Sequence, residues 1–400
     1  MTDVPVPTNP VFRLLVLATL LAASGPGAGA QTPRQSFDLV VPTSPVPVTV
    51  AGTTRLVYEL HITNFAADTL RLTRLEVLEA DSSGRRMADF ERDALESLLE
   101  GVGFEADDSD PPAVEPGGRS VAFFWLAVDA AAGVPQSLLH RLTYRVTGED
   151  GPGSTVMGGR VAVSPSAPPA LMPPLRGGPW VAVYFPSMAR GHRRVLLPLD
   201  GRVHIPARFA IDWMKIDEHG RLASGDATRV ANWHGYGADV LAVGHGTVVA
   251  VRSSVEESQT VEHVAHGLTK ETGNHITLDL GNGLYVSYEH LRPGSVLVSL
   301  GDRVQAGQTI AQLGYTGDSG GPHLHMHVSD GPAPLEGEGL PFVITAFEYL
   351  GEYSFGESLG DGRWTPTPDG PETRTRELPA PNSVVHFGSA ARGAQLGVRH

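Results

Sequence analysis

Residues 314–328 read GYTGDSGGPHLHMHV, a glycine-rich approach followed by histidines at every second position. Successive side chains of a β-strand point to opposite faces, so His323, His325 and His327 are expected on one face, within reach of a single ion or substrate. The glycines before them allow the backbone to come close to whatever is bound. The segment therefore predicts a strand that carries a binding or catalytic site.

The other histidines of the chain concentrate around this strand. Twelve of the 16 lie between His192 and His327, and the chain contains no cysteine. One of them, His290, belongs to a Tyr-Glu-His-Leu segment at 288–291 that follows an expected strand over 275–280 and a glycine-rich turn. Neutral imidazole ligates zinc and titrates near neutral pH. Clustered histidines without cysteine therefore predict a metal or acid–base site built from His and carboxylates.

Several segments in a fixed order carry a resemblance to a known family. Taken together, they resemble the core of the lysostaphin/LytM zinc metalloendopeptidases, which cut peptide bonds in bacterial peptidoglycan. The resemblance covers about residues 180–351 and implies a small antiparallel β fold with a groove, one zinc ion and a pair of histidines that do not bind the metal. The segments are 237–249, 273–275, 288–291, 301–308 and 314–328.

The resemblance also implies roles for particular residues. It makes His325 a zinc ligand and His290 and His323 the catalytic pair. The family's other two ligands come from a His-x-Gly-x-Asp strand, which is best matched here by residues 208–212, with Asp212 as a ligand and Arg208 in the place of the histidine. A guanidinium has no lone pair to donate to zinc. A histidine from elsewhere must then complete the site.

Three histidines are candidates for this vacant ligand position. Strand pairing about a turn at 199–202 would bring His192 alongside the strand that carries Asp212. An insertion could fold His234 back toward the site. His204 lies eight residues before Asp212, roughly 26 Å away along an extended strand. We rank His192 first, His234 second and His204 third, so the predicted ligands are His192, Asp212 and His325.

The start of the chain resembles a secretory signal peptide. An apolar run at 14–23 is followed by Ala-Gly-Ala at 28–30, the small-residue pattern of a cleavage site. The run is shorter than the about 20 residues that a membrane-spanning helix needs. We therefore expect residues 1–30 to be removed, leaving a periplasmic or extracellular protein without a transmembrane segment.

The remaining sequence divides into four parts and predicts a mainly β protein. Short, turn-bounded strands over 36–164 indicate an immunoglobulin-like β-sandwich. This sandwich could cover the groove, dock a partner or space the enzyme from the membrane. A proline-rich linker is expected at 165–179, followed by an antiparallel β-sheet peptidase domain of the lysostaphin/LytM type at 180–351. Residues 352–400 are rich in proline and are expected to form an irregular C-terminal tail.

These features favour one function over its alternatives. The net charge of −14 argues against a nucleic-acid partner. The expected activity is that of an exported zinc endopeptidase that hydrolyses peptidoglycan peptides through a metal-activated water, assisted by His290 and His323. The alternative, favoured by Arg208, is a degenerate LytM-like domain that binds peptidoglycan or regulates a cell-wall amidase. Another peptide substrate, such as a secreted protein, is a third possibility.

Overall fold

The computed structural model describes residues 35–81, 83–102, 112–188, 191–262, 267, 270–355 and 362–388. The expected signal peptide at 1–30 lies outside these residues. Within the described ranges, no helix combines the length and the apolar character needed to cross a membrane. The residues from Ser36 onward belong to one compact unit.

Two antiparallel sheets form the amino-terminal half of this unit. The first has the order β1-β3-β8-β6, with β2 paired to β3, and the second has the order β10-β9-β4-β5, with β7 paired to β4. The one α-helix among the described residues, α1, connects β5 to β6. The strands and helix are β1 (Phe37–Val40), β2 (Val48–Val50), β3 (Thr53–Asn64), β4 (Leu70–Glu79), β5 (Arg86–Glu91), α1 (Arg92–Leu98), β6 (Leu99–Val102), β7 (Ala113–Val114), β8 (Arg119–Ala127), β9 (Ser137–Val146) and β10 (Ser154–Ala162).

Alternating apolar side chains join these two sheets through one core. Leu60 and Ile62 of β3 and Phe124 of β8 belong to the same buried cluster as Leu72 of β4 and Leu142 of β9. Apolar residues at every second position bury one face of each sheet. The structure thus shows two antiparallel sheets over a shared core, and the immunoglobulin-like topology stays a prediction.

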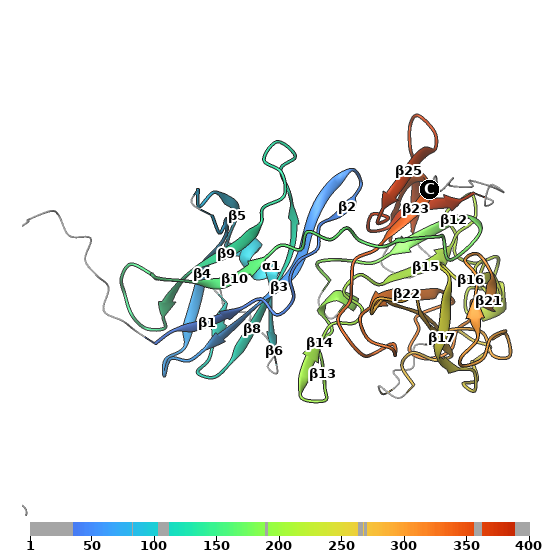
Figure 1. The fold of residues 1–400 in the computed structure, drawn as a ribbon, viewed down its shortest axis with the longest axis horizontal. Helices are drawn as coiled ribbons and strands as arrows, with labels where there is room; N and C mark the ends of the chain where they lie inside the picture. Colours follow the sequence, from blue (N-terminus) through green and yellow to red (C-terminus); the bar gives the residue numbers. More distant parts are fainter. Residues whose placement is uncertain are drawn as a thin grey trace, which may run out of the picture. The chain divides into compact units, whose positions relative to one another are not determined.

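A twelve-stranded sheet dominates the second half (Figure 1). Its order is β11-β23-β26-β12-β15-β22-β19-β18-β17-β20, with β24 and β25 paired to β23. Two smaller sheets, β13-β14 and β16-β21, and two 3₁₀ helices complete it. The elements are β11 (Ala170–Leu171), β12 (Gly177–Val183), η1 (His192–Arg194), β13 (Leu197–Leu199), β14 (Arg202–His204), β15 (Ile211–Lys215), η2 (Val230–Asn232), β16 (Asp239–Leu241), β17 (Gly246–Arg252), β18 (His275–Asp279), β19 (Tyr285–Glu289), β20 (Arg303–Val304), β21 (Thr309–Gln312), β22 (Leu324–Ser329), β23 (Val343–Ser354), β24 (Arg363–Pro366), β25 (Glu372–Glu377) and β26 (Ser383–Phe387).

The expectation of an irregular tail over 352–400 is wrong for its described part. That part contains the end of β23 and the whole of β24, β25 and β26, and β26 pairs with both β23 and β12 inside the large sheet. Most of the tail's prolines lie between these strands. Proline has no amide hydrogen to donate, and at these positions its absence removes no hydrogen bond between strands. The expected linker at 165–179 likewise contains β11 and the start of β12.

The aromatic side chain at the end of β26 yields a first prediction. Phe387 is fully buried, and its ring centroid lies 5.3 Å from that of Trp213. Trp213 is the residue after Asp212 on β15. A Phe387→Ala substitution is expected to lower the free energy of unfolding by about 3–5 kcal/mol, because it removes buried apolar surface and leaves a cavity. Urea unfolding measures the change. Thr365→Ala in the exposed strand β24 is the control, and equal stability of the two variants would contradict the assignment of β26 to the core.

A buried histidine in the amino-terminal half predicts a pH dependence of stability. His140 Nδ1 lies 3.0 Å from the carbonyl oxygen of Gly159, so Nδ1 carries the hydrogen and Nε2 accepts from the Tyr58 hydroxyl at 2.9 Å. Burial lowers the pKa of His140 to about 4. The unfolded chain, with a histidine pKa near 6.5, binds the extra proton first as pH falls. The stabilisation is therefore complete above pH 6.5 and is lost toward pH 4.

The expected loss in the free energy of unfolding between pH 7 and pH 4 is about 3 kcal/mol from this group. Urea unfolding at a series of pH values measures it. A His140→Gln variant cannot titrate and should show a correspondingly flatter profile. Identical pH profiles for the two proteins would show that His140 is not buried as a neutral ring.

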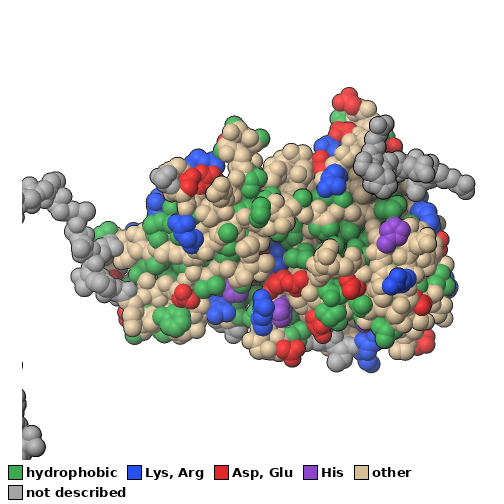
Figure 2. Space-filling view, viewed as in Figure 1, with side chains coloured by type: hydrophobic (Ala, Val, Ile, Leu, Met, Phe, Trp, Pro, Cys, Tyr) green, Lys and Arg blue, Asp and Glu red, His purple; other side chains and the backbone are tan. Residues whose placement is uncertain are grey.

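The surface agrees with the acidic composition. On the face shown in Figure 2, Lys and Arg side chains are interspersed with Asp and Glu side chains rather than gathered into one basic patch.

Candidate functional site

Strand register in the large sheet brings the key acidic and basic residues together. Asp212 on β15 is the pairing partner of His325 on β22, and Glu289 on β19 pairs with His325 from the other side. Directly opposed residues on neighbouring strands have adjacent side chains. His325 therefore lies between two carboxyl groups in the middle of the sheet.

Asp212 lies at the centre of three side chains that could hold a metal ion. Its Oδ2 lies 3.2 Å from His192 Nε2, and its Oδ1 lies 2.8 Å from His325 Nδ1. One ligand atom from each of the three side chains lies within 4.8 Å of the others. Two imidazole nitrogens and a carboxylate are a donor set that zinc accepts in hydrolases, and they leave a fourth position open. The side chains present therefore fit the metal that the sequence predicts.

His192 reaches Asp212 by a different route from the one expected. The hairpin about 199–202 exists, but its ladder ends at Leu197, paired with His204. His192 lies beyond it in η1, and its ring meets that of His325 edge-on with centroids 4.8 Å apart. A three-residue 3₁₀ turn, rather than strand pairing, thus places the side chain.

The other two candidates for the vacant position contact different acidic residues. His234 Nε2 lies 3.9 Å from Asp217 Oδ2, and His204 Nδ1 lies 3.6 Å from Glu338 Oε1. Neither belongs to the groups of metal-binding side chains found in the described ranges. Of the three candidates, His192 is the one whose ring contacts Asp212.

Arg208, which occupies the expected ligand position, is directed elsewhere. Its guanidinium is buried and lies 2.9 Å from Glu59 Oε2 and 2.7 Å from Glu338 Oε2. It also donates to the carbonyl oxygen of Gly339 at 2.9 Å. Arg208 thus joins a network of buried ion pairs and takes no part in the group of His192, Asp212 and His325.

The predicted catalytic histidines lie beside this group and are held by backbone carbonyls. His290 Nδ1 is 2.7 Å from the carbonyl oxygen of Thr316, and His323 Nδ1 is 2.8 Å from that of Gly321. A carbonyl oxygen only accepts, so both Nδ1 atoms carry hydrogen and each Nε2 is the nitrogen that can exchange a proton. The two rings have centroids 4.6 Å apart.

Their surroundings move the two pKa values in opposite directions. Burial lowers the pKa of His290 well below its ordinary value, and the neighbouring His323 and His325 rings lower it further. Burial also lowers the pKa of His323, but the Asp212 carboxylate, 3.3 Å from its Nε2, raises it by more, so that the result lies above the ordinary value. The site therefore holds one ring that favours the neutral form and one that favours the charged form.

The backbone around the catalytic pair adopts conformations that few residues tolerate. His290 has a φ of +60°, in the left-handed region that non-glycine residues seldom occupy. Gly317 has a φ of +84°, and a Cβ atom there would lie 2.4 Å from the carbonyl oxygen of Glu271. A non-glycine residue in such a conformation is strained and is kept there by its surroundings, as is common at active sites.

Glu289 also lies at the site, although no role was predicted for it from the sequence. Its Oε1 is 3.4 Å from His327 Nδ1, which is itself 3.2 Å from His325 Nε2. Burial, reinforced by the nearby Glu271 and Asp212, raises the pKa of Glu289 well above its ordinary value. Glu289, His325 and His327 form a further group that could hold a metal ion. One feature of the sequence could have indicated this role: when the strand over 285–289 pairs with the HLHMH strand, Glu289 lies opposite His325.

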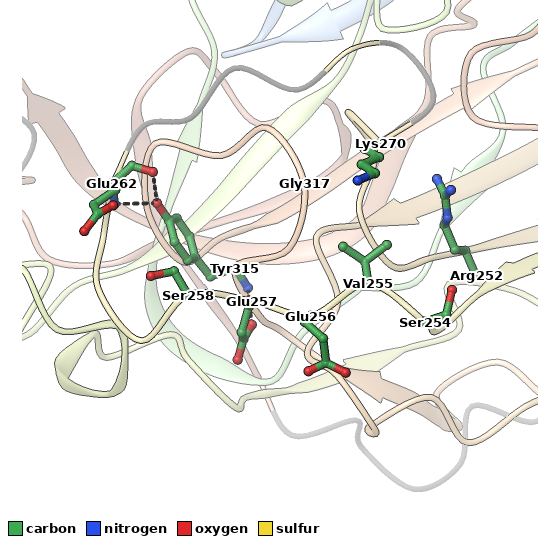
Figure 3. Close-up of a pocket in the computed structure, with 10 residues that line it drawn as sticks. All are labelled: Arg252, Ser254, Val255, Glu256, Glu257, Ser258, Glu262, Lys270, Tyr315 and Gly317. Atoms are coloured by element: carbon green, nitrogen blue, oxygen red, sulfur yellow. Dashed lines mark hydrogen bonds between the residues drawn. The ribbon is translucent and has the colours of Figure 1, made fainter.

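A cavity of about 330 Å³ opens over the site, and its lining includes His192, Glu289, His290, His325 and His327. A second cavity, of about 460 Å³, is shown in Figure 3. There the Tyr315 hydroxyl donates to the carbonyl oxygen of Glu262 at 2.7 Å and accepts from the Glu262 amide at 2.9 Å. No described residue that lines it is a histidine. The first of these two cavities, unlike the second, therefore gives access to His192 and His325.

Sequence comparison identifies the segment that contains most of these histidines. Residues 231–336 match the model of Peptidase family M23. A protein of Buchnera aphidicola subsp. Baizongia pistaciae named "Uncharacterized metalloprotease" is 30% identical over 92 residues, which make up 23% of this chain and 20% of that protein. The chain thus spans about a fifth of the length of this curated relative.

Solved structures of similar proteins bear M23 or peptidase names. A mutant catalytic domain of the prophage-encoded M23 protein EnpA from Enterococcus faecalis is 22% identical, with a TM-score of 0.26 over 42% of this chain and 92% of that chain. The catalytic domain of the antimicrobial peptidase lysostaphin from Staphylococcus simulans is also 22% identical, with a TM-score of 0.20 over 39% and 80% of the two chains. Residues 231–336, which include His290, His323 and His325, thus match the model of Peptidase family M23.

Proposed function

We propose that the chain is an exported zinc metalloendopeptidase that hydrolyses peptide bonds in bacterial peptidoglycan. The observation that supports this most strongly is the donor group of His192, Asp212 and His325, with the histidine pair beside it. The M23 match gives the peptidase class. The substrate follows from the resemblance to the lysostaphin/LytM family.

His192, Asp212 and His325 would hold the zinc ion. When bound, zinc lowers the pKa of a water ligand toward neutrality and polarises a carbonyl group. Burial tends to raise the pKa of Asp212, but the neighbouring His192 and His323 lower it well below the ordinary value, so the carboxylate is ionised at neutral pH. An ionised carboxylate is the form that binds a metal.

His290 and His323 would move protons during hydrolysis. Each ring is fixed by a hydrogen bond from Nδ1 to a backbone carbonyl, which leaves Nε2 to take a proton from the attacking water or give one to the leaving amine. A protonated Nε2 can also stabilise negative charge on the carbonyl oxygen. Both rings are buried, and His290 lines the cavity.

The alternative function is a domain that binds peptidoglycan or regulates a cell-wall amidase without hydrolysis. Arg208 at the expected ligand position favours it, because it removes one donor from the strand that leads to Asp212. The contact between His192 and Asp212 favours the enzyme, because it restores a three-donor group.

Digestion of purified peptidoglycan distinguishes these functions. The full chain is incubated with sacculi, and the released fragments are identified by mass spectrometry, before and after removal of metal with a chelator. The proposal predicts new peptide amino termini that disappear on chelation and return with zinc. His245→Ala, which changes an exposed histidine, serves as the matched control. Binding to sacculi without cleavage, by protein loaded with zinc, would favour the regulatory alternative.

A further inference from the structure

We propose that the amino-terminal sheets position the metal ligand His192, with Arg193 and Arg194 as the positioning residues. The inference rests on the proposed metal site and adds a role for residues 36–164, which become part of the site's construction. His192 lies in a three-residue 3₁₀ turn outside any strand ladder. Such a short turn has little stability of its own, so its position depends on the contacts that its neighbours make.

The two residues that follow His192 are anchored on the amino-terminal sheets. Arg193 and Arg194 are both buried, which is unusual for arginine. Arg193 Nη2 donates to the carbonyl oxygens of Phe124 on β8 and Tyr58 on β3, at 2.6 and 3.1 Å. Arg194 Nη2 donates to the carbonyl oxygen of Ser97 in α1 at 2.7 Å. The turn is thus tied to three elements of the first half of the chain.

Aromatic packing adds to these hydrogen bonds. The guanidinium carbons of Arg193 and Arg194 lie 5.7 and 5.0 Å from the ring centroid of Phe123 on β8. A cation over an aromatic face is attracted to it, and more strongly where water is excluded. Phe123 also belongs to a small apolar cluster that includes Ile205 and against which Leu196 packs. The 3₁₀ turn and the segment that follows it therefore pack against β8.

One buried carboxylate links this anchor to the missing ligand. Glu59 on β3 is 1% exposed; its Oε1 lies 3.4 Å from Arg193 Nη2 and its Oε2 lies 2.9 Å from Arg208 Nε. A buried charge needs such partners to offset its desolvation. The arginine that replaced a ligand and the arginine beside the new ligand thus share one acid from the amino-terminal half. Arg208 at the expected ligand position and Arg193 beside His192 therefore belong to one network of ion pairs, centred on Glu59.

This arrangement has a measurable consequence for metal binding. His192 is partly exposed, with a third of its side-chain surface accessible, so packing around the ring alone does not fix it. Loss of the residues that orient a metal ligand typically weakens metal binding by about 10–100-fold. Weakening the anchor should therefore lower zinc affinity through His192, without any change in the ligands themselves.

A double-mutant cycle on the full chain tests the inference. Zinc affinity is measured in competition with chelators of graded strength for the wild type, Arg193→Met, His192→Ala and the double variant. Methionine keeps an apolar stem but removes the donors. We expect Arg193→Met to weaken zinc binding by about 10-fold or more in the wild-type background, and to have no further effect when His192 is already absent.

The controls separate positioning from general damage. Arg74→Met removes an arginine of β4 that pairs with Asp89 on the neighbouring strand β5, and it should leave zinc affinity unchanged. Circular dichroism of the metal-free variants checks folding, and Arg194→Met replaces Arg193→Met in the cycle if the latter does not fold. Equal losses in both backgrounds, or no loss in either, would overturn the inference. A wild type that binds no zinc would instead contradict the proposed function itself.

Discussion

An Asp212→Asn variant is expected to bind zinc more than about 100-fold more weakly than the wild type and to release no peptidoglycan fragments above background. The substitution keeps the size of the side chain but removes its charge. Asp212 contacts both of the other proposed ligands, and its loss should exceed the about 10–100-fold cost of removing an outer partner. Without the carboxylate, only His192 and His325 remain as donors.

Zinc titration and fragment release are measured on the same protein preparations. His245→Ala again provides a histidine substitution on the exposed surface, and it should behave as the wild type in both assays. Thermal unfolding of the metal-free variant separates lost metal from lost fold. Full zinc affinity in Asp212→Asn would mean that the metal is bound by another group of side chains.

A His323→Ala variant is expected to slow hydrolysis by roughly 10²–10⁴-fold, the contribution typical of a general acid or base, while it still binds one zinc ion. The reason is that His323 Nε2 lies 3.3 Å from Asp212 but is not needed to complete the group of His192, Asp212 and His325. Hydrolysis rate and zinc content of the same sample give the two readings. A His290→Ala variant should show the same combination.

This second prediction decides between two placements of the metal. His290, His323 and His325 also form a group that could hold an ion. If zinc were bound there, both His290→Ala and His323→Ala would lose it together with activity. Retained zinc with lost activity assigns the two rings to proton transfer, whereas loss of zinc in both variants would make them ligands.

Local sequence patterns predicted the centre of the site. The period of two in HLHMH predicted that His323, His325 and His327 would lie on one face. In the structure, His323 and His325 contact Asp212, and His327 contacts Glu289. The glycine-rich turn at 281–283 set the register of β18 against β19. Short-range geometry governs such features, so they can be derived from a single sequence.

Features that depend on distant contacts could not be derived in this way. A three-residue turn such as η1 has no periodicity, and the hydrogen bond between Arg193 and Glu59 joins residues 134 positions apart. The proline content of the last fifty residues led to the prediction of an irregular tail. The apolar residues Val384, Val385 and Phe387 of β26 are buried because β26 pairs with both β23 and β12, and these pairings join distant parts of the chain. His192 contacts Asp212 through η1 and not through the expected strand pairing, and its role as a ligand stays a prediction.

The central claim is that His192 replaces the ligand lost at Arg208, and zinc content tests it most directly. Purified full-length protein is reconstituted with zinc, freed of excess metal and analysed by atomic emission, alongside His192→Ala, His204→Ala and His234→Ala. We predict one zinc ion per chain in the wild type and in the His204 and His234 variants, and only a small fraction of one in His192→Ala. A His192→Ala variant that keeps its full complement of zinc would contradict it.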